Sequence, residues 1–218
     1  MCGVNSGRHK CPAASKARSC VVTVIRKIAE REPRVRHIPG EAGTWIFILG
    51  DMTIFSGFFV TYLVYRSSSV TMFNNSSAQL KQIFGLVNTL LLLTSSLCVI
   101  AGIRAIRRRA TTIAPWLFAG AFLCGAGFST NKFLEYSAKV SHHITPTTNE
   151  FWMYFYILTG LHFFHLLVGM AVLIYLMVKS RKSTLTVKEY AFVEGGACFW
   201  HMVDLLWIVL FPLLYFVR

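Results

Sequence analysis

The chain has 218 residues, of which 55% are hydrophobic and only 14% are charged, and its mean hydropathy is +0.54. This composition excludes an ordinary soluble domain, in which roughly a quarter of the residues are charged, and it places the chain in a membrane. The formal net charge of +13 does not indicate a nucleic-acid partner, because no segment supplies the solvated basic face that such a partner requires.

The N-terminal segment is basic. Residues 1–39 hold nine Lys and Arg, and they contain no apolar run longer than CVVTVI, which is too short for the centre of a secretory signal. We interpret residues 1–42 as a basic cytoplasmic tail whose charge orients the chain, with attraction to anionic lipid as the alternative. Because no Cys-x-x-Cys pair occurs, we expect no zinc site or disulfide framework but mostly inert thiols, at Cys2, Cys11, Cys20, Cys98, Cys124 and Cys198.

Five apolar stretches follow, and each is long enough for the roughly 20-residue helix that spans a bilayer. They cover residues 45–65, 83–103, 114–133, 151–178 and about 191–216. Continuous apolar runs such as NTLLLLTSSLCVIAGI exclude the alternating strands of a membrane barrel. We therefore predict an all-α, polytopic membrane protein in which residues 43–218 form a bundle of five transmembrane helices.

The basic residues predict the topology of this bundle. Seventeen Lys and Arg lie in the tail and in the loops at 104–113 and 179–190, whereas five lie on the other side. The positive-inside rule then places the N-terminus in the cytoplasm and the C-terminus outside.

Several ionisable residues interrupt the apolar segments. Asp51 lies in the first segment, and Lys132 and Glu135 lie three residues apart at the outer end of the third, where they are able to form an ion pair. His162, His165 and Gly169 share one stripe of the fourth segment. On the fifth segment, helical spacing puts five residues on one face, namely Glu194, Cys198, His201, Leu205 and Ile208. Asp204 lies one turn beyond His201.

A charge at mid-membrane costs about 2.5–3.5 kcal/mol on insertion scales, so we expect pairing, protonation or a polar interior for these residues, whose depths allow them to meet in space. One explanation is haem ligation by His162 or His165 together with His201. A second is a metal site built from the same three histidines and Asp204. A third, which we favour, is a polar network that fixes the packing of the helices, with proton handling by Asp51 as a variant of it. We therefore assign no catalytic, cofactor or metal residue, and the network consists of Asp51, Glu194, His162, His165, His201 and Asp204.

Five segments, in this order and spacing, resemble subunit III of the haem-copper oxidases. They are ILGDMTIFSGFF, GLVNTLLLLTSS, NKFLEYSAK, TGLHFFHLLVGM and EGGACFWHMVDLLWIVLFPLLYF, and the resemblance covers residues 43–216. It implies an accessory, cofactor-free and non-catalytic subunit of a cytochrome c or quinol oxidase in the bacterial cytoplasmic membrane. This subunit would pack beside catalytic subunit I and subunit II, which carry the haem and copper, would bind phospholipid, and would support stability and proton uptake.

The resemblance also assigns roles to residues. It implies that Glu194, His162, His165, His201 and Asp204 belong to a structural polar core, and that Asp51 stands where the family often has an intramembrane glutamate. Two departures leave the partner complex open: the chain has five predicted helices instead of seven, and the motifs GDM, EYSAK and HHITPTTNEFWMYFY resemble the subgroup associated with nitric oxide reductases. A distant alternative is a small transporter or ion-conducting protein, although the internal repeats typical of transporters are not found.

Overall fold

The structure, a computed structural model, describes residues 42–182 and 185–216. This part of the chain is helical and has six helices: α2 (Ala42–Ser68), α3 (Val70–Ser77), α4 (Gln82–Arg107), α5 (Ala114–Ser141), α6 (Glu150–Lys179) and α7 (Val187–Tyr215). The all-α prediction is confirmed. Most of the long helices extend beyond the predicted apolar segments, and α3, whose sequence VTMFNNSS is largely polar, was not predicted. The predicted tail, apart from Ala42, lies outside the described residues, as do Cys2, Cys11 and Cys20.

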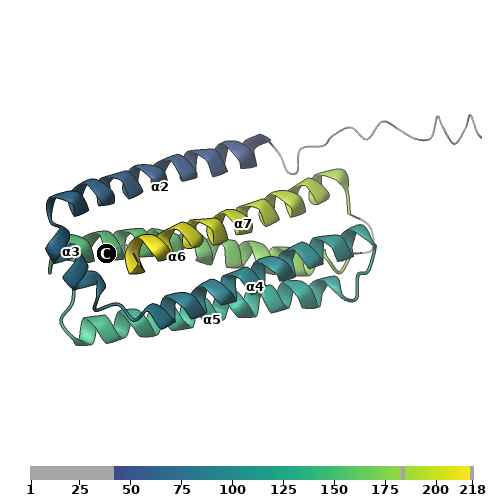
Figure 1. The fold of residues 1–218 in the computed structure, drawn as a ribbon. Helices are drawn as coiled ribbons and strands as arrows, with labels where there is room; N and C mark the ends of the chain where they lie inside the picture. The colour runs from purple at the N-terminus through teal and green to yellow at the C-terminus, as the bar shows by residue number, and fades with distance from the viewer. Residues whose placement is uncertain (1–41, 183–184, 217–218) are drawn as a thin grey trace, which may run out of the picture. The chain divides into compact units, whose positions relative to one another are not determined.

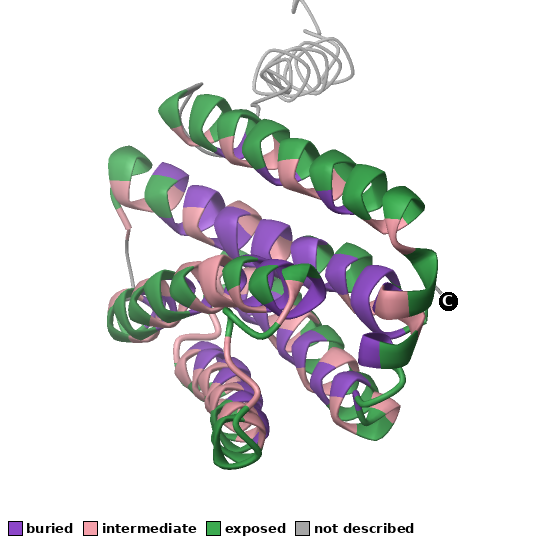
Figure 2. Cartoon of the chain, turned by 90° about the vertical axis from the view of Figure 1, so that its left-hand side faces the viewer, coloured by how far each residue is buried: buried purple, intermediate pink, exposed green. Residues whose placement is uncertain are grey.

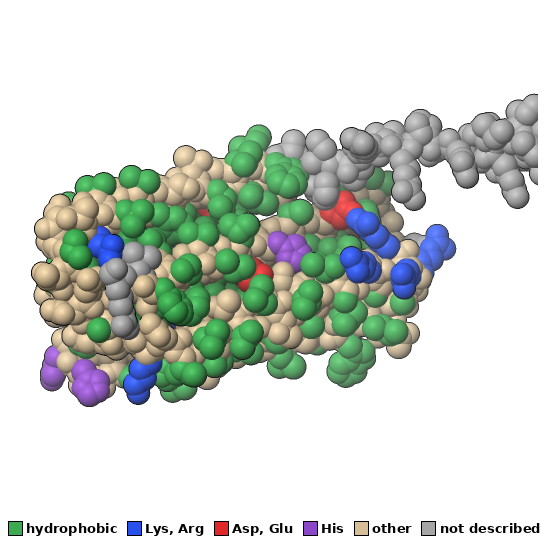
Figure 3. All heavy atoms as spheres, in the orientation of Figure 1, with side chains coloured by type: hydrophobic (Ala, Val, Ile, Leu, Met, Phe, Trp, Pro, Cys, Tyr) green, Lys and Arg blue, Asp and Glu red, His purple; other side chains and the backbone are tan. Residues whose placement is uncertain are grey.

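Four helices, α2, α4, α6 and α7, are long and apolar enough to cross a membrane. The remaining long helix, α5, has 28 residues, but small and polar residues alternate with its apolar ones. The hydrophobic surface of the bundle is visible in Figure 3, where Lys and Arg gather mainly toward one end. The chain is therefore an all-α integral membrane protein with several apolar helices.

Local chemistry sets the helix ends. The side chain of Asn149 accepts a hydrogen bond from the backbone N–H of Trp152 at 3.0 Å and so caps α6. Thr186 and Glu189 form a capping box at the start of α7. At the end of α4, Arg109 adopts a left-handed backbone conformation with φ of 56°. The N–H of the next residue then donates to the carbonyl of Ala105 at 2.9 Å, which closes the helix in a Schellman motif.

The helices α4, α5, α6 and α7 pack in succession, and α7 also packs along α4, so that these four close into a bundle (Figure 1). The first spanning helix, α2, contacts α6 and α7 at fewer positions and keeps most of its surface exposed (Figure 2). Among the four apolar spans α7 is the most buried and α2 the least. α7 therefore lies at the centre of the packing and α2 at its edge.

The five residues that share one face of α7 by helical spacing are not buried to the same extent. Leu205 and Ile208 are 48% and 43% exposed, whereas Leu206 and Trp207 are fully buried. Glu194 is buried as expected and His201 is only half-buried. Helical spacing alone did not show which side of α7 faces the lipid, because apolar residues occur all round this helix.

Candidate functional site

The carboxylate of Asp51 on α2 lies against His165 on α6. The distance from Asp51 Oδ1 to His165 Nε2 is 3.0 Å, and both side chains are almost buried. The other ring nitrogen, His165 Nδ1, lies 2.8 Å from the carbonyl oxygen of Leu161. Because a carbonyl only accepts hydrogen bonds, Nδ1 carries a proton, and the contact between Nε2 and Oδ1 then needs a further proton on one of the two atoms. A hydrogen bond between Nε2 and Oδ1 therefore joins α2 to α6.

Aromatic rings surround this pair. The rings of Phe55 and Phe199 lie 5.6 and 6.5 Å from the His165 ring, measured between centroids. Within the described residues, Asp51 Oδ2 has no hydrogen-bond partner. The pair is thus a polar contact in apolar surroundings, with one carboxylate oxygen available to a further donor.

His201 and Asp204 lie one helical turn apart on α7. The Ser96 hydroxyl of α4 lies 2.6 Å from His201 Nδ1, and Asp204 Oδ1 is buried without a hydrogen-bond partner among the described residues. Among the residues that the structure describes, no hydrogen bond or ion pair joins His201 to Asp204. His201 therefore ties α7 to α4 through Ser96, which the sequence analysis did not single out.

His162 takes part in a separate contact. Its Nε2 lies 3.1 Å from the carbonyl oxygen of Val203 on α7 and, facing an acceptor, carries the proton. The ring is completely buried and packs against Phe128 and Trp207, with centroid distances of 5.5 and 5.2 Å. His162 therefore joins α6 to the backbone of α7, and it is not part of the Asp51–His165 pair.

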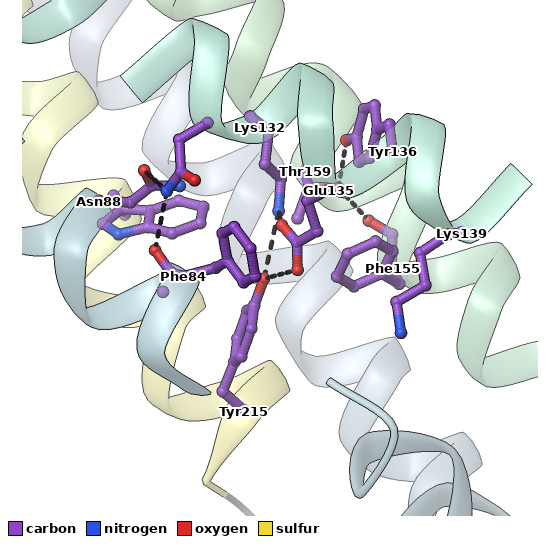
Figure 4. A network of polar contacts seen from close by, with 12 residues as sticks. Phe84, Asn88, Lys132, Glu135, Tyr136, Lys139, Phe155, Thr159 and Tyr215 are labelled. Carbon is purple, nitrogen blue, oxygen red and sulfur yellow. Dashed lines mark hydrogen bonds and ion pairs between the residues drawn. The ribbon is translucent and has the colours of Figure 1, made fainter. Parts of the chain in front are cut away.

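The structure brings Lys132 and Glu135 together inside the bundle (Figure 4). Lys132 Nζ lies 2.7 Å from Glu135 Oε2, and Tyr215 donates its hydroxyl to Glu135 Oε1 at 2.7 Å. The Lys132 ammonium group also lies 4.8 and 5.2 Å from the ring centroids of Phe155 and Trp207. The sequence predicted this pair at the outer end of a helix, but Lys132 is only 1% exposed. Tyr215 was not predicted because it lies 80 residues away along the chain.

At the opposite end of α7, Glu194 is bound by a residue that the sequence analysis counted only as a topology charge. Arg107 at the end of α4 places Nη2 2.9 Å from Glu194 Oε1 and donates from Nε to the Tyr190 hydroxyl at 2.7 Å. The sequence signal for this pairing was that Arg107 and Glu194 both lie at expected boundaries of the membrane. This ion pair fastens the end of α4 to the start of α7.

The ionisable residues thus occupy several places along the bundle. They do not meet in one network, because Asp51 with His165, and separately His162, His201 and Glu194, contact partners at different places on neighbouring helices. Within residues 42–182 and 185–216, no three His, Cys, Asp or Glu side chains are grouped as metal ligands. In the described part of the chain the thiols of Cys98, Cys124 and Cys198 are free and half-buried.

The sequence model of the cytochrome c oxidase subunit III family matches residues 38–218. The chain belongs to this family. It is 31% identical over 194 residues to cytochrome c oxidase subunit 3 of Synechocystis sp., an alignment that covers 82% of this chain and 81% of the relative. The protein of the same name from Alkalihalophilus pseudofirmus is 30% identical, and the alignment covers 79% of this chain and 84% of the relative. That of Corynebacterium diphtheriae is 28% identical and is covered to 87%, with 81% of this chain aligned.

The family match confirms the resemblance found in the sequence, and with it the expected function as subunit III of a respiratory oxidase. These relatives carry cytochrome c oxidase names, and they give no support to the nitric oxide reductase subgroup. Asp51 and His165 lie in the segments ILGDMTIFSGFF and TGLHFFHLLVGM that carried the resemblance, and in the fold these two segments meet.

Proposed function

We propose that the chain is a non-catalytic, cofactor-free accessory subunit that binds oxidase subunits I and II and uses the Asp51–His165 pair to support proton uptake by subunit I. In this proposal five helices, α5 included, span the bacterial cytoplasmic membrane with the N-terminus inside. Haem and copper belong to the partner subunits, and membrane phospholipid binds to this chain.

The observation that carries the proposal is the contact between Asp51 Oδ1 and His165 Nε2, which are 3.0 Å apart and almost buried. Transfer of a proton between a carboxyl group and an imidazole in contact converts a neutral pair into an ion pair over a single hydrogen bond, and both side chains are of the type that acts in general acid–base chemistry. The pair also joins α2, the least buried span, to α6, so a purely structural role is the competing explanation.

The other histidines support a cofactor-free chain. His162 Nε2 is directed at a backbone carbonyl and His201 Nδ1 at a serine hydroxyl. Bis-histidine haem ligation would require the loss of one or both contacts. The transporter alternative gains no support from the described residues, because their buried ionisable groups are held in separate local contacts.

The substitution Asp51→Asn distinguishes a role of Asp51 in proton transfer from a role in helix packing. Asparagine keeps the size and hydrogen bonding of aspartate but exchanges no proton, so we expect full assembly with slower turnover, or fewer turnovers before inactivation, most visibly at high pH where protons are scarce. The measurement is oxygen consumption against pH, normalised to assembled complex. Thr53→Val is the matched control on the same helix, because Thr53 bonds only within α2, to the Leu49 carbonyl at 2.8 Å.

If the Asp51→Asn variant assembles fully and its pH profile is unchanged, Asp51 does not relay protons and its role is in helix packing. Asp51→Ala removes the hydrogen bond as well, and we expect it to impair assembly under either role.

The partner subunits that co-purify with the tagged chain identify the complex. Nitric oxide reductase subunits in place of oxidase subunits would favour the alternative assignment.

The proposed topology predicts the locations of two reporter fusions. A reporter fused after Arg109 is expected to be cytoplasmic, and one fused after Arg218 is expected to be outside, because three spans separate these points. Alkaline phosphatase and fluorescent-protein fusions measure this directly. Finding both on the same side would contradict five spanning helices.

A further inference from the structure

A pocket of about 360 Å³ opens at the end of the bundle where α4 and α6 end and α7 begins. Six polar side chains line it, and we call it the end pocket: Arg107, Arg109, Thr111, Ser180, Lys182 and Tyr190. Its volume falls within the range of roughly 300–1,000 Å³ that small-molecule sites occupy. It lies away from the Asp51–His165 pair and has no part in the proposed proton uptake.

The surroundings of the end pocket are strongly basic. Stretches 104–113 and 179–190 together contain eight Lys and Arg but one acidic residue, Glu189. Lys and Arg side chains gather at this end of the bundle in Figure 3. A positive potential of this kind attracts anions and strengthens with each unpaired cation.

The cations of the end pocket differ in how far they are neutralised. Arg107 is paired with Glu194 at 2.9 Å. Lys182 lies 3.3 Å from Glu189, but that carboxylate is closer to Lys179, at 2.6 Å, and the Lys182 side chain is 57% exposed. Within the part of the chain that the structure describes, the side chain of Arg109 makes no hydrogen bond or ion pair. The pocket therefore keeps a net positive charge after its internal pairs are counted.

We propose that the end pocket binds a phosphate group, with Arg109 and Lys182 as its principal cationic contacts and Thr111 as a hydroxyl donor. The planar guanidinium of arginine suits paired phosphate oxygens, and lysine adds a point charge. The phosphate belongs either to the headgroup of an anionic phospholipid at the membrane surface or to a free phosphate ion. The inference does not rest on the proposed proton uptake.

The test uses the purified full chain in mild detergent, titrated separately with phosphatidylglycerol, phosphatidylcholine and inorganic phosphate. Native mass spectrometry counts bound molecules, and the thermal unfolding midpoint reports stabilisation. The double variant Arg109→Gln/Lys182→Gln is expected to bind phosphatidylglycerol at least about tenfold more weakly, because each basic residue near an anionic surface strengthens binding by a similar amount and the variant removes two of them. Arg107 is left in place because it holds Glu194.

The matched control is Arg108→Gln/Lys188→Gln, which removes the same charge from exposed positions of the same end outside the pocket. The proposal is supported if the control variant binds phosphatidylglycerol within about twofold of the unaltered chain while the Arg109→Gln/Lys182→Gln variant shows the tenfold loss. Binding of phosphatidylglycerol alone identifies a lipid headgroup, and binding of inorganic phosphate as well identifies a site for free phosphate. Equal losses in both variants, equal binding of phosphatidylcholine, or no binding would overturn the proposal.

Discussion

Replacing Lys132 by methionine is expected to lower the free energy of unfolding by about 3–5 kcal/mol. The substitution leaves the Glu135 carboxylate buried with only the Tyr215 hydroxyl as a partner, at 2.7 Å. A buried charge without its counter-ion keeps its desolvation cost and loses the attraction that offset it. Unfolding in mild detergent, followed by tryptophan fluorescence against denaturant, measures the change.

A double variant separates the charge from the packing. Lys132→Met/Glu135→Gln removes both charges and keeps an acceptor for the Tyr215 hydroxyl, so it is expected to regain most of the lost stability. Lys188→Met on the exposed start of α7 is the control for the loss of a lysine. A double variant as unstable as Lys132→Met would show that lost packing, and not the unpaired carboxylate, causes the effect.

Replacing Gly169 by valine is expected to destabilise the bundle by about 1–3 kcal/mol or more. A Cβ atom at Gly169 would lie 2.8 Å from the Trp200 ring, and one at Gly125 would lie 3.1 Å from the same ring. The indole is therefore held between glycines of α5 and α6 and has no room to move aside. In membranes such small residues permit close helix packing that a larger side chain prevents.

Gly160 provides the matched control on the same helix. A Cβ there meets nothing within 4 Å, so Gly160→Val is expected to leave the unfolding midpoint nearly unchanged. Replacing the indole by the smaller phenyl ring, Trp200→Phe, is expected to restore part of the stability lost in Gly169→Val. Equal effects at Gly160 and Gly169 would show that helix propensity, and not the contact with Trp200, determines the result.

The contacts of the buried polar residues were only partly predictable from sequence. Lys132 and Glu135 were paired correctly because a three-residue spacing places them on one side of a helix. The pairing of Asp51 with His165 was not distinguished from other pairings, since the two residues are separated by three helices in the chain. Ser96 and Tyr215 were missed because nothing in their local sequence marks them as partners of histidine or carboxylate side chains, and Arg107 was missed because its position at a membrane boundary was assigned to topology alone.

The sequence by itself determined the membrane class, the long helices and the family, since apolar run length, the distribution of basic residues and motif order are properties of the chain alone. Only the tertiary structure decided which side of α7 is buried, because that helix is apolar all round and its packing partners choose the face. It also decided that the buried ionisable residues form separate pairs. A polar side chain in a bilayer binds the nearest partner on a neighbouring helix, and helix neighbours follow from packing.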